Sequence, residues 1–296
     1  MKAPHARHRR IGQLPVGWLV GIMAAVCATT VAVSPASALG ATPDHESAAS
    51  TYDNTVMADR PVGFWHDAAG HDLVGQRHAR PVGAPGTTRT PNGDSAALFN
   101  GTRRYLEVAD SDRWSPATTG KLTVEAWMRP STLQFPDCYV HWLGKGEPGQ
   151  QEWTLRMYAR STPCESPPRP NRVSIYAFNR SGGLGTGGYF QGGLDGIPVM
   201  EPNVWVHVVG VINAVDKSPT YPNGYVRIYR NGRLVNTRDL FSTVPIRLEN
   251  GTAPLRIGTQ NLDGFFRGAI GKVAIYDREL SASRVLAHYR AMNSSG

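Results

Sequence analysis

The sequence contains little charge, few cysteines and no repeated segment. Only 18% of its 296 residues are charged and 41% are hydrophobic, which excludes an intrinsically disordered chain. The 32 glycines and 22 prolines follow no period, which excludes collagen and low-complexity classes. A chain of this length can bury a sizeable core in one large domain or two small ones. The many turn residues favour β-structure and argue against long helical bundles.

Acidic residues are missing from the first 38 positions, and this shapes the overall charge. Those positions hold four of the 31 Lys and Arg residues, so the rest of the chain has 27 basic against 23 acidic residues. A small excess of this kind is ordinary for the surface of a soluble domain. The formal charge of +8 therefore gives no support for a nucleic-acid partner.

The N-terminal 38 residues have the pattern of a secretory signal peptide. Three arginines and two histidines between positions 5 and 10 precede an apolar stretch from Leu14 to Val33, and Ala36-Ser37-Ala38 supplies a small-x-small cleavage site. We predict cleavage after Ala38, a secreted extracellular protein, no membrane association after cleavage and a flexible segment over residues 39–51. A permanent single-pass anchor is the alternative, because the apolar stretch approaches membrane-spanning length.

Cysteine is scarce, and its placement suggests a disulfide. Cys27 belongs to the signal peptide, so Cys138 and Cys164 remain as an even pair in a secreted chain. A bridge between them would close a loop of about 27 residues and stabilise the fold by about 3 kcal/mol in the chain-entropy model. A zinc pair or a catalytic thiol is the alternative, but the neighbouring Cys and His spacing that either requires is missing.

The remaining chain, residues 52–292, reads as a single domain without an internal linker. Short runs of β-branched and aromatic residues recur between turn signals, which predicts two packed antiparallel sheets. The predicted strands are Ala96–Phe99, Tyr105–Val108, Leu122–Met128, Tyr139–Gly144, Glu152–Tyr158, Arg172–Phe178, Trp205–Asn213, Gly224–Tyr229, Leu255–Gly258 and Ala269–Tyr276.

Two local signals complete the predicted secondary structure. The pair Asn231-Gly232 fits a tight turn between strands at 226–229 and 234–237. The segment Ser281–Met292 is the only one predicted to be helical, with Ser281 or Ser283 as its N-cap.

Several motifs in their order along the chain resemble bacterial laminin-G-like domains of the concanavalin A-like class. The resemblance spans roughly residues 52–289. It implies an all-β, antiparallel two-sheet jelly-roll sandwich with a short C-terminal helix. That architecture carries lectins, adhesion modules, glucanases and lyases, so it implies little about the ligand. The motifs are Ala97-Leu98-Phe99-Asn100-Gly101, Leu122-Thr123-Val124-Glu125-Ala126-Trp127, Trp205-Val206-His207-Val208-Val209-Gly210, Tyr229-Arg230-Asn231-Gly232 and Ala269-Ile270-Gly271-Lys272-Val273-Ala274-Ile275-Tyr276.

The chain departs from this family where many members carry acidic residues. Gly271-Lys272 replaces an Asp-Glu pair in the last strand, and Arg103-Arg104 replaces an acidic residue earlier in the chain. Both changes argue against a calcium-dependent site at the rim. We expect no required cofactor, although a structural calcium ion built from separate loops stays open. Its candidate ligands are Asp110, Asp112, Asp195 and Asp263.

The stretch Cys138–Gly196 is longer and richer in Trp, Tyr and Gly than a minimal module requires. We therefore expect any function specific to this domain to lie there. It contains the pattern G-x-G-x-x-G at Gly183, Gly185 and Gly188, but no helix signal follows, so a dinucleotide site is excluded. The glycines predict a loop with positive φ at several positions. No nucleophile elbow of the type G-x-S-x-G and no paired-acid glucanase motif occurs in the chain.

Strand alternation predicts a polar cluster on the surface of the sandwich. If Val124, Leu155 and Ile175 face the core, their polar neighbours along each strand face outward. Mixed aromatic, carboxylate, guanidinium and hydroxyl groups suit a sugar, because rings stack on its apolar face and polar groups bind its hydroxyls. The predicted ligand-binding residues are Glu125, Glu152, Arg156, Tyr158, Ser174, Tyr176, His207 and Tyr189, with Phe190, Phe265 and Phe266 as further loop aromatics.

We therefore expect a secreted, non-catalytic module that binds a polysaccharide or a cell-surface glycan. The first alternative is a carbohydrate-active enzyme, either a glycoside hydrolase with Glu125 and Glu152 as an acid/base pair assisted by Arg156, or a polysaccharide lyase using Tyr158, His207 and Arg156. The second alternative is an adhesion module that binds a protein through loop aromatics.

Overall fold

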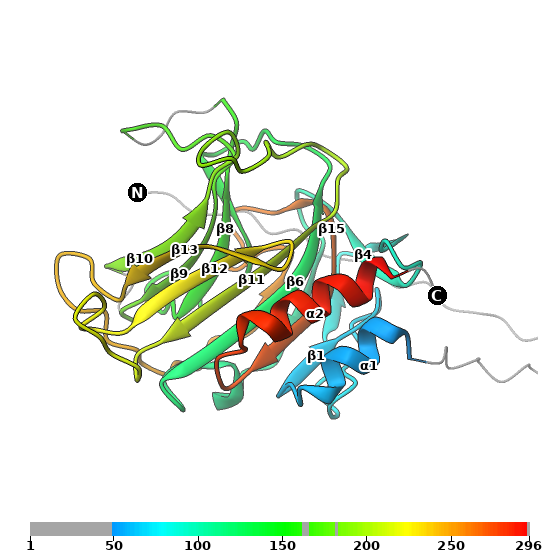
Figure 1. Ribbon diagram of the computed structural model, residues 1–296. Coiled ribbons are helices and arrows are strands. Elements are labelled where there is room, and N and C mark those ends of the chain that lie inside the picture. Colours follow the sequence, from blue (N-terminus) through cyan, green and yellow to red (C-terminus); the bar gives the residue numbers. More distant parts are fainter. Residues whose placement is uncertain (1–48, 162–165, 181–182, 295–296) are drawn as a thin grey trace, which may run out of the picture. The chain divides into compact units, whose positions relative to one another are not determined.

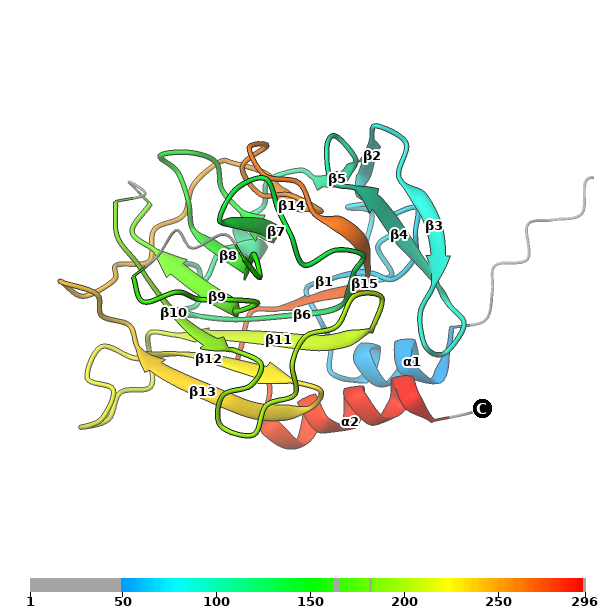
Figure 2. The same ribbon diagram turned by 90° about the horizontal axis from the view of Figure 1, so that it is seen from above.

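The computed structural model describes residues 49–161, 166–180 and 183–294. They form two stacked antiparallel sheets, with two α-helices lying on the outer side of one sheet (Figures 1 and 2). The predicted all-β jelly-roll sandwich with a C-terminal helix is thereby confirmed. The predicted signal peptide and Cys164 lie outside the described residues, so the secretion and disulfide predictions stay predictions.

Sheet A has eight strands in the order β13-β12-β11-β6-β15-β4-β3, and β1 also pairs with β15. All pairings in this sheet are antiparallel. Its strands are β1 (Gly63–Trp65), β3 (Gly86–Arg89), β4 (Ser95–Asn100), β6 (Lys121–Pro130), β11 (Val206–Asn213), β12 (Tyr225–Arg230), β13 (Arg233–Asp239) and β15 (Arg267–Tyr276).

Sheet B has seven strands in the order β10-β9-β8-β7-β14-β5-β2. Four of them, β7 to β10, follow one another along the chain as a meander and carry most of the predicted site. The strands are β2 (Arg80–Val82), β5 (Tyr105–Val108), β7 (Tyr139–Lys145), β8 (Trp153–Tyr158), β9 (Val173–Phe178), β10 (Gly185–Phe190) and β14 (Leu255–Ile257), and a short 3₁₀ helix, η1, covers Asp112–Trp114.

The core lies between the sheets and follows the predicted alternation. Val124 of β6, Leu155 of β8 and Ile175 of β9 are fully buried in one hydrophobic cluster. Tryptophans from both sheets and from η1 fill the same cluster, among them Trp114 and Trp153. Alternation of period two therefore sorts inward from outward side chains correctly in β6, β8 and β9, whereas register shifts interrupt it in β7 and β15.

The helices α1 (Thr51–Ala58) and α2 (Ala282–Asn293) build a second apolar cluster on the outer face of sheet A. Helix α2 has the predicted N-cap, because the Ser281 hydroxyl accepts a hydrogen bond from the Arg284 amide. Helix α1 was not predicted. It is only two turns long and buries just two apolar side chains, Tyr52 and Val56, so its sequence lacks a helical stripe.

The predicted tight turn joins β12 to β13. Asn231 and Gly232 have φ values of 51° and 79°, the two positive values that a type I′ hairpin turn requires. The hairpin prediction is confirmed. Among the described residues, no helix is long and apolar enough to cross a membrane.

The prediction of a positive-φ loop in the glycine-rich segment is wrong over residues 183–190. Residues 185–190 form the edge strand β10, and none of its three glycines has a positive φ. The glycines instead leave room for aromatic side chains of the neighbouring strand β9. A Cβ at Gly185 would lie 2.5 Å from the Phe178 ring, and one at Gly187 would lie 3.0 Å from the Tyr176 ring. Glycine is thus required at positions 185 and 187 because aromatic rings of β9 lie too close for a side chain.

Candidate functional site

The outer face of sheet B brings together part of the predicted ligand-binding set. Arg156 and Tyr158 project from β8, Ser174 and Tyr176 from β9, and Tyr189 from β10, where the register pairs Arg156 with Ser174 and Ser174 with Tyr189. Both α-helices lie on sheet A, so neither covers this face (Figure 2). We call the outer side of β7 to β10 the tyrosine–arginine face.

Arg156 lies at the centre of this face, between two aromatic rings. The carbon of its guanidinium is 4.1 Å from the centroid of Tyr139 and 4.4 Å from that of Tyr176. Its Nε donates to His141 Nε2 at 2.8 Å and its Nη1 donates to the Tyr158 hydroxyl at 3.1 Å. A guanidinium stacked between two rings is rigid, so the clamp orients its remaining donors before any ligand arrives.

The ionisation of the surrounding groups follows from this charge. Burial, together with the positive charge of Arg156, lowers the pKa of His141 to about 3, so the imidazole is neutral and accepts from the guanidinium. Burial and the neighbouring Tyr158 raise the pKa of Tyr176 to about 12. Burial also acts to raise the pKa of Tyr158, but Arg156, Tyr176 and Arg169 together outweigh it and the net pKa is lowered. The hydroxyls of Tyr158 and Tyr176 lie 3.1 Å apart.

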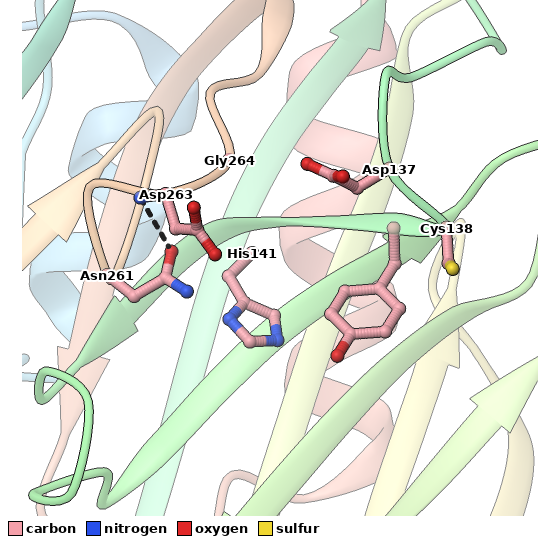
Figure 3. A pocket seen from close by; sticks show the side chains of 7 residues that line it. Asp137, Cys138, His141, Asn261, Asp263 and Gly264 are labelled. Atoms are coloured by element: carbon pink, nitrogen blue, oxygen red, sulfur yellow. Dashed lines mark hydrogen bonds between the residues drawn. The ribbon is translucent and has the colours of Figure 1, made fainter. Parts of the chain in front are cut away.

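A pocket of about 260 Å³ lies next to this clamp, between the start of β7 and the loop before β15. Figure 3 shows the carboxylates of Asp137 and Asp263 on two sides of it. His141, only 4% exposed, has no hydrogen-bond partner for its Nδ1 among the described residues. The pocket combines carboxylate acceptors with ring surface, which matches the edges and faces of a sugar. Its lining residues are Asp137, Cys138, Tyr139, His141, Asn261, Asp263 and Gly264.

The edge of the tyrosine–arginine face contains a second stacked arginine. The guanidinium carbon of Arg172 is 3.8 Å from the centroid of Tyr189, and its Nε donates to Gln191 Oε1 at 3.1 Å. Tyr176 and Phe178 stack with centroids 5.8 Å apart above the glycines of β10. Sequence reasoning missed Tyr139, His141 and Arg172. Arg172 has the parity of the predicted Ser174 and Tyr176, whereas no residue of β7 was predicted to bind a ligand.

The structure corrects the placement of Glu125 and His207. Both lie on sheet A, in β6 and β11, and both are fully buried under α1 and α2. Glu125 accepts hydrogen bonds from the Tyr52 hydroxyl at 2.7 Å, from His207 Nε2 at 2.8 Å and from His288 Nδ1 at 2.8 Å. Alternation shows on which side of its own sheet a residue lies, but it does not show which of the two sheets that is.

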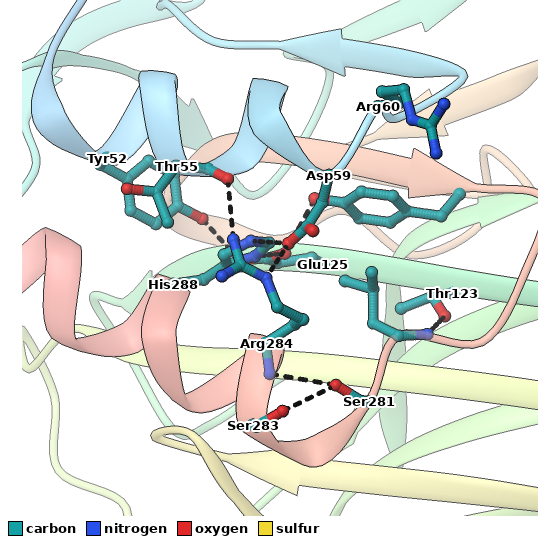
Figure 4. A network of polar contacts seen from close by, with 12 residues as sticks. Tyr52, Thr55, Asp59, Arg60, Thr123, Glu125, Ser281, Ser283, Arg284 and His288 are labelled. Atoms are coloured by element: carbon teal, nitrogen blue, oxygen red, sulfur yellow. Dashed lines mark hydrogen bonds and ion pairs between the residues drawn. The ribbon is translucent and has the colours of Figure 1, made fainter.

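The Glu125 network joins both helices to the sheet (Figure 4). His288 of α2 donates from its other nitrogen, Nε2, to Asp59 at 2.8 Å, and Asp59 also accepts from Arg284 Nε at 2.6 Å. Burial acts to raise the pKa of Glu125, but His288 and His207 outweigh it and lower that pKa well below its usual range. Burial acts to lower the pKa of His288, but Glu125 and Asp59 raise it. The network is therefore a buried ion pair that holds the helices in place.

Glu152 also lies apart from the predicted cluster. Its carboxylate pairs with the buried ammonium of Lys145 and accepts from the Gly251 amide at 3.0 Å. Glu125 lies in β6 of sheet A, whereas Glu152 directly precedes β8 of sheet B, and each carboxylate is bonded within the protein. The predicted acid/base pair of these two residues is therefore wrong. The predicted lyase residues are also separated, because His207 lies on sheet A whereas Arg156 and Tyr158 lie on sheet B. That prediction is therefore wrong as well.

The four candidate calcium ligands are not brought together into one site. Asp110 pairs with Lys145 at 2.8 Å, and Asp112 accepts from the Asn250 amide at 2.6 Å. Asp195 lies in the exposed loop after β10, and Asp263 lines the pocket. Within the described ranges, no group of three or more His, Cys, Asp or Glu side chains could hold a metal ion.

Lys272 fills the position where the family resemblance implied an acidic residue. It lies in an irregular part of β15 with a φ of 56°, and its side chain is only 1% exposed. Its ammonium contacts Asp53 at 2.6 Å and Asp94 at 2.8 Å. The single ammonium of Lys272 therefore bridges these two carboxylates.

Two of the four suspected loop aromatics are core residues. Phe190 and Phe266 are 1% and 0% exposed and belong to the main hydrophobic cluster, so their prediction as loop aromatics is wrong. Tyr189 and Phe265 remain partly exposed. Phe265 packs against Tyr105 rather than against the clamp, with ring centroids 6.1 Å apart.

The sequence and fold place the chain in a known family. The model of the concanavalin A-like lectin/glucanases superfamily matches residues 100–286, and the chain belongs to this family. Its fold is similar to domain 4 of AbnA, a GH43 extracellular arabinanase from Geobacillus stearothermophilus, solved in complex with arabinotriose. The TM-score is 0.54 at 16% identity, over 77% of this chain and 98% of that one.

Receptor-binding domains of botulinum neurotoxins share the same fold. The serotype D domain in complex with N-acetylneuraminic acid has a TM-score of 0.55 at 15% identity, over 80% of this chain and 52% of that one. The DC domain in complex with rat synaptotagmin II has a TM-score of 0.55 at 13% identity, over 79% and 52%. The chain thus spans about half the length of these domains. No curated protein matches the chain.

Proposed function

We propose that the protein is a secreted, non-catalytic glycan-binding module whose ligand lies on the tyrosine–arginine face and in the adjoining pocket. The observation that carries this proposal is the Arg156 clamp between Tyr139 and Tyr176, directly beside a pocket with two carboxylates. Sugars present apolar ring faces and polar edges, and this surface offers both kinds of partner.

Two further observations support this site over the rest of the surface. Helices α1 and α2 cover the central strands on the outer face of sheet A, whereas neither helix covers the outer face of sheet B. The similar arabinanase domain and serotype D neurotoxin domain were solved with arabinotriose and with N-acetylneuraminic acid, so the fold is compatible with sugar ligands.

Removal of one ring tests the proposal. We expect Tyr176→Ala to weaken retention on the best-bound member of a panel of insoluble and soluble polysaccharides by about tenfold, as expected for an anchor worth about 1.4 kcal/mol. Tyr221→Ala is the matched control, because Tyr221 is a partly exposed tyrosine in the loop before β12 of sheet A. Equal losses in both variants, or no binding to any polysaccharide, would contradict the proposal.

The same panel separates the alternatives. Wild-type protein should release no reducing ends or unsaturated products from these polysaccharides. Release of either product would show that the protein is an enzyme. Exposed Leu194, Val199 and Val204 after β10 favour the adhesion alternative, as does the neurotoxin domain solved with synaptotagmin II. Capture of a protein partner that Val199→Ser abolishes, without any glycan binding, would favour that alternative.

A further inference from the structure

The tyrosine–arginine face carries two guanidinium groups that have no acidic partner among residues 49–161, 166–180 and 183–294. Among the described residues, neither Arg156 nor Arg172 forms a salt bridge, and their hydrogen bonds go to the neutral groups His141, Tyr158 and Gln191. An arginine has five N–H donors in a fixed fork. Within the described part of the chain, Arg172 donates only from its Nε, so its two terminal nitrogens offer donors to a ligand.

The stacking of these arginines makes their charge available at fixed positions. The rings of Tyr139 and Tyr176 hold Arg156, and the ring of Tyr189 holds Arg172. The pKa of Arg172 is lowered by burial and then by the nearby charge of Arg169, which shows that positive groups crowd this edge of the sheet. A surface with several positive charges attracts anions. Because its arginine side chains are already held in place, they lose less conformational entropy when a ligand binds.

A buried serine hydroxyl lies between the two arginines. Ser174 is 1% exposed, and its Oγ forms no hydrogen bond within the described part of the chain. The register places it beside Arg156 of β8 on one side and beside Tyr189, the ring under Arg172, on the other. Buried polar groups are almost always satisfied, so an unused hydroxyl at this position points to a ligand that accepts a hydrogen bond there.

The acidic groups of the site lie at its other end. Asp137 and Asp263 line the pocket beside β7, whereas Arg172 lies towards the edge strand β10. Carboxylates there suit the hydroxyl groups of a sugar and repel anions. The charges therefore favour an anionic group on the β8 to β10 side.

We infer that the ligand is an acidic polysaccharide, whose carboxylate groups pair with Arg156 and Arg172 while neutral ring hydroxyls occupy the pocket. This inference rests on the proposed glycan-binding function and specifies that the ligand is negatively charged. Bidentate pairing of guanidinium with carboxylate supplies both affinity and direction.

The experiment compares polygalacturonate with its fully methyl-esterified form, which has the same sugar backbone without the charge. Affinity electrophoresis or calorimetry should show binding of polygalacturonate that is at least about tenfold tighter and that weakens as salt rises. Arg172→Gln should remove most of this preference, and Arg172→Lys should restore it only in part because lysine lacks the fork. Arg233→Gln on β13 of sheet A is the matched control, since Arg233 is exposed and lies on the other sheet.

Three results would overturn the inference. Equal binding of the charged and esterified polymers would show a neutral glycan ligand and would leave the proposed function standing. Equal binding of polyglutamate would show attraction to any polyanion instead of sugar recognition. No binding of any acidic or neutral polysaccharide would reject both the inference and the proposed function.

Discussion

Replacement of Glu125 by glutamine should destabilise the domain strongly. The carboxylate is fully buried and accepts hydrogen bonds from Tyr52, His207 and His288. The amide that replaces one oxygen is a donor and would face groups that also donate. Loss of one partner of a buried ion pair costs about 3–5 kcal/mol, and we expect the free energy of unfolding to fall by that amount.

The loss should depend on pH in a defined direction. The pKa of Glu125 is lowered in the folded protein, so its contribution is present above its ordinary pKa of 4.5 and is lost as pH falls. The pKa of His288 is raised, so its contribution is fully present below its ordinary pKa of 6.5 and is lost as pH rises through the folded value. The wild-type network therefore stabilises most between these two values.

Urea unfolding followed by tryptophan fluorescence provides the measurement. The difference between wild type and Glu125→Gln should be largest near roughly pH 5.5 and smaller near roughly pH 8.5. Glu249→Gln is the control, because the Glu249 side chain is 52% exposed and pairs only loosely with Arg180, at 3.9 Å. A loss below about 1 kcal/mol for Glu125→Gln, or the same difference at both pH values, would refute the account of the network.

Four further predictions concern stability and covalent structure. Lys272→Met leaves two carboxylates without their cation and should lower the free energy of unfolding by about 3–5 kcal/mol in urea titrations. A chelator should barely change the melting temperature of wild type, and a drop of several degrees would reveal a calcium site. Gly187→Ala, whose Cβ would lie 2.4 Å from a backbone oxygen of β9, should cost about 1–3 kcal/mol, whereas Gly183→Ala, with open space around its Cβ, should cost little. Intact-mass analysis of the secreted protein after alkylation without reductant should find Cys138 and Cys164 unlabelled, and labelling of either would contradict the predicted bridge.

Strands such as β6 and β8 could be predicted because their side chains alternate between the core and the outer face. Val124 and Leu155 face inward, and their neighbours Glu125 and Arg156 face outward, as expected. A sandwich has two outer faces, however, and strand pairing between distant segments decides which face a strand contributes to. Nothing within β6 or β8 encodes that pairing, so Glu125 was assigned to the face that actually belongs to Arg156.

Two other differences have separate physical causes. The glycines of β10 suggested a flexible loop, but they are needed because the rings of Tyr176 and Phe178 lie across that strand. Helix α1 carries no amphipathic stripe, and it is held by tertiary contacts such as the hydrogen bond from Tyr52 to Glu125. Local sequence patterns do not record contacts of either kind, since the partner residues are distant in the chain.

The positions of α1 and α2 determine how the domain would be displayed. Both helices lie against sheet A, so the polypeptide enters at Ser50 and leaves after Asn293 on the side away from the tyrosine–arginine face. Any neighbouring domain or support joined through either terminus would thus meet the helical side. The opposite side would stay free to reach a long polymer without steric interference from the attachment.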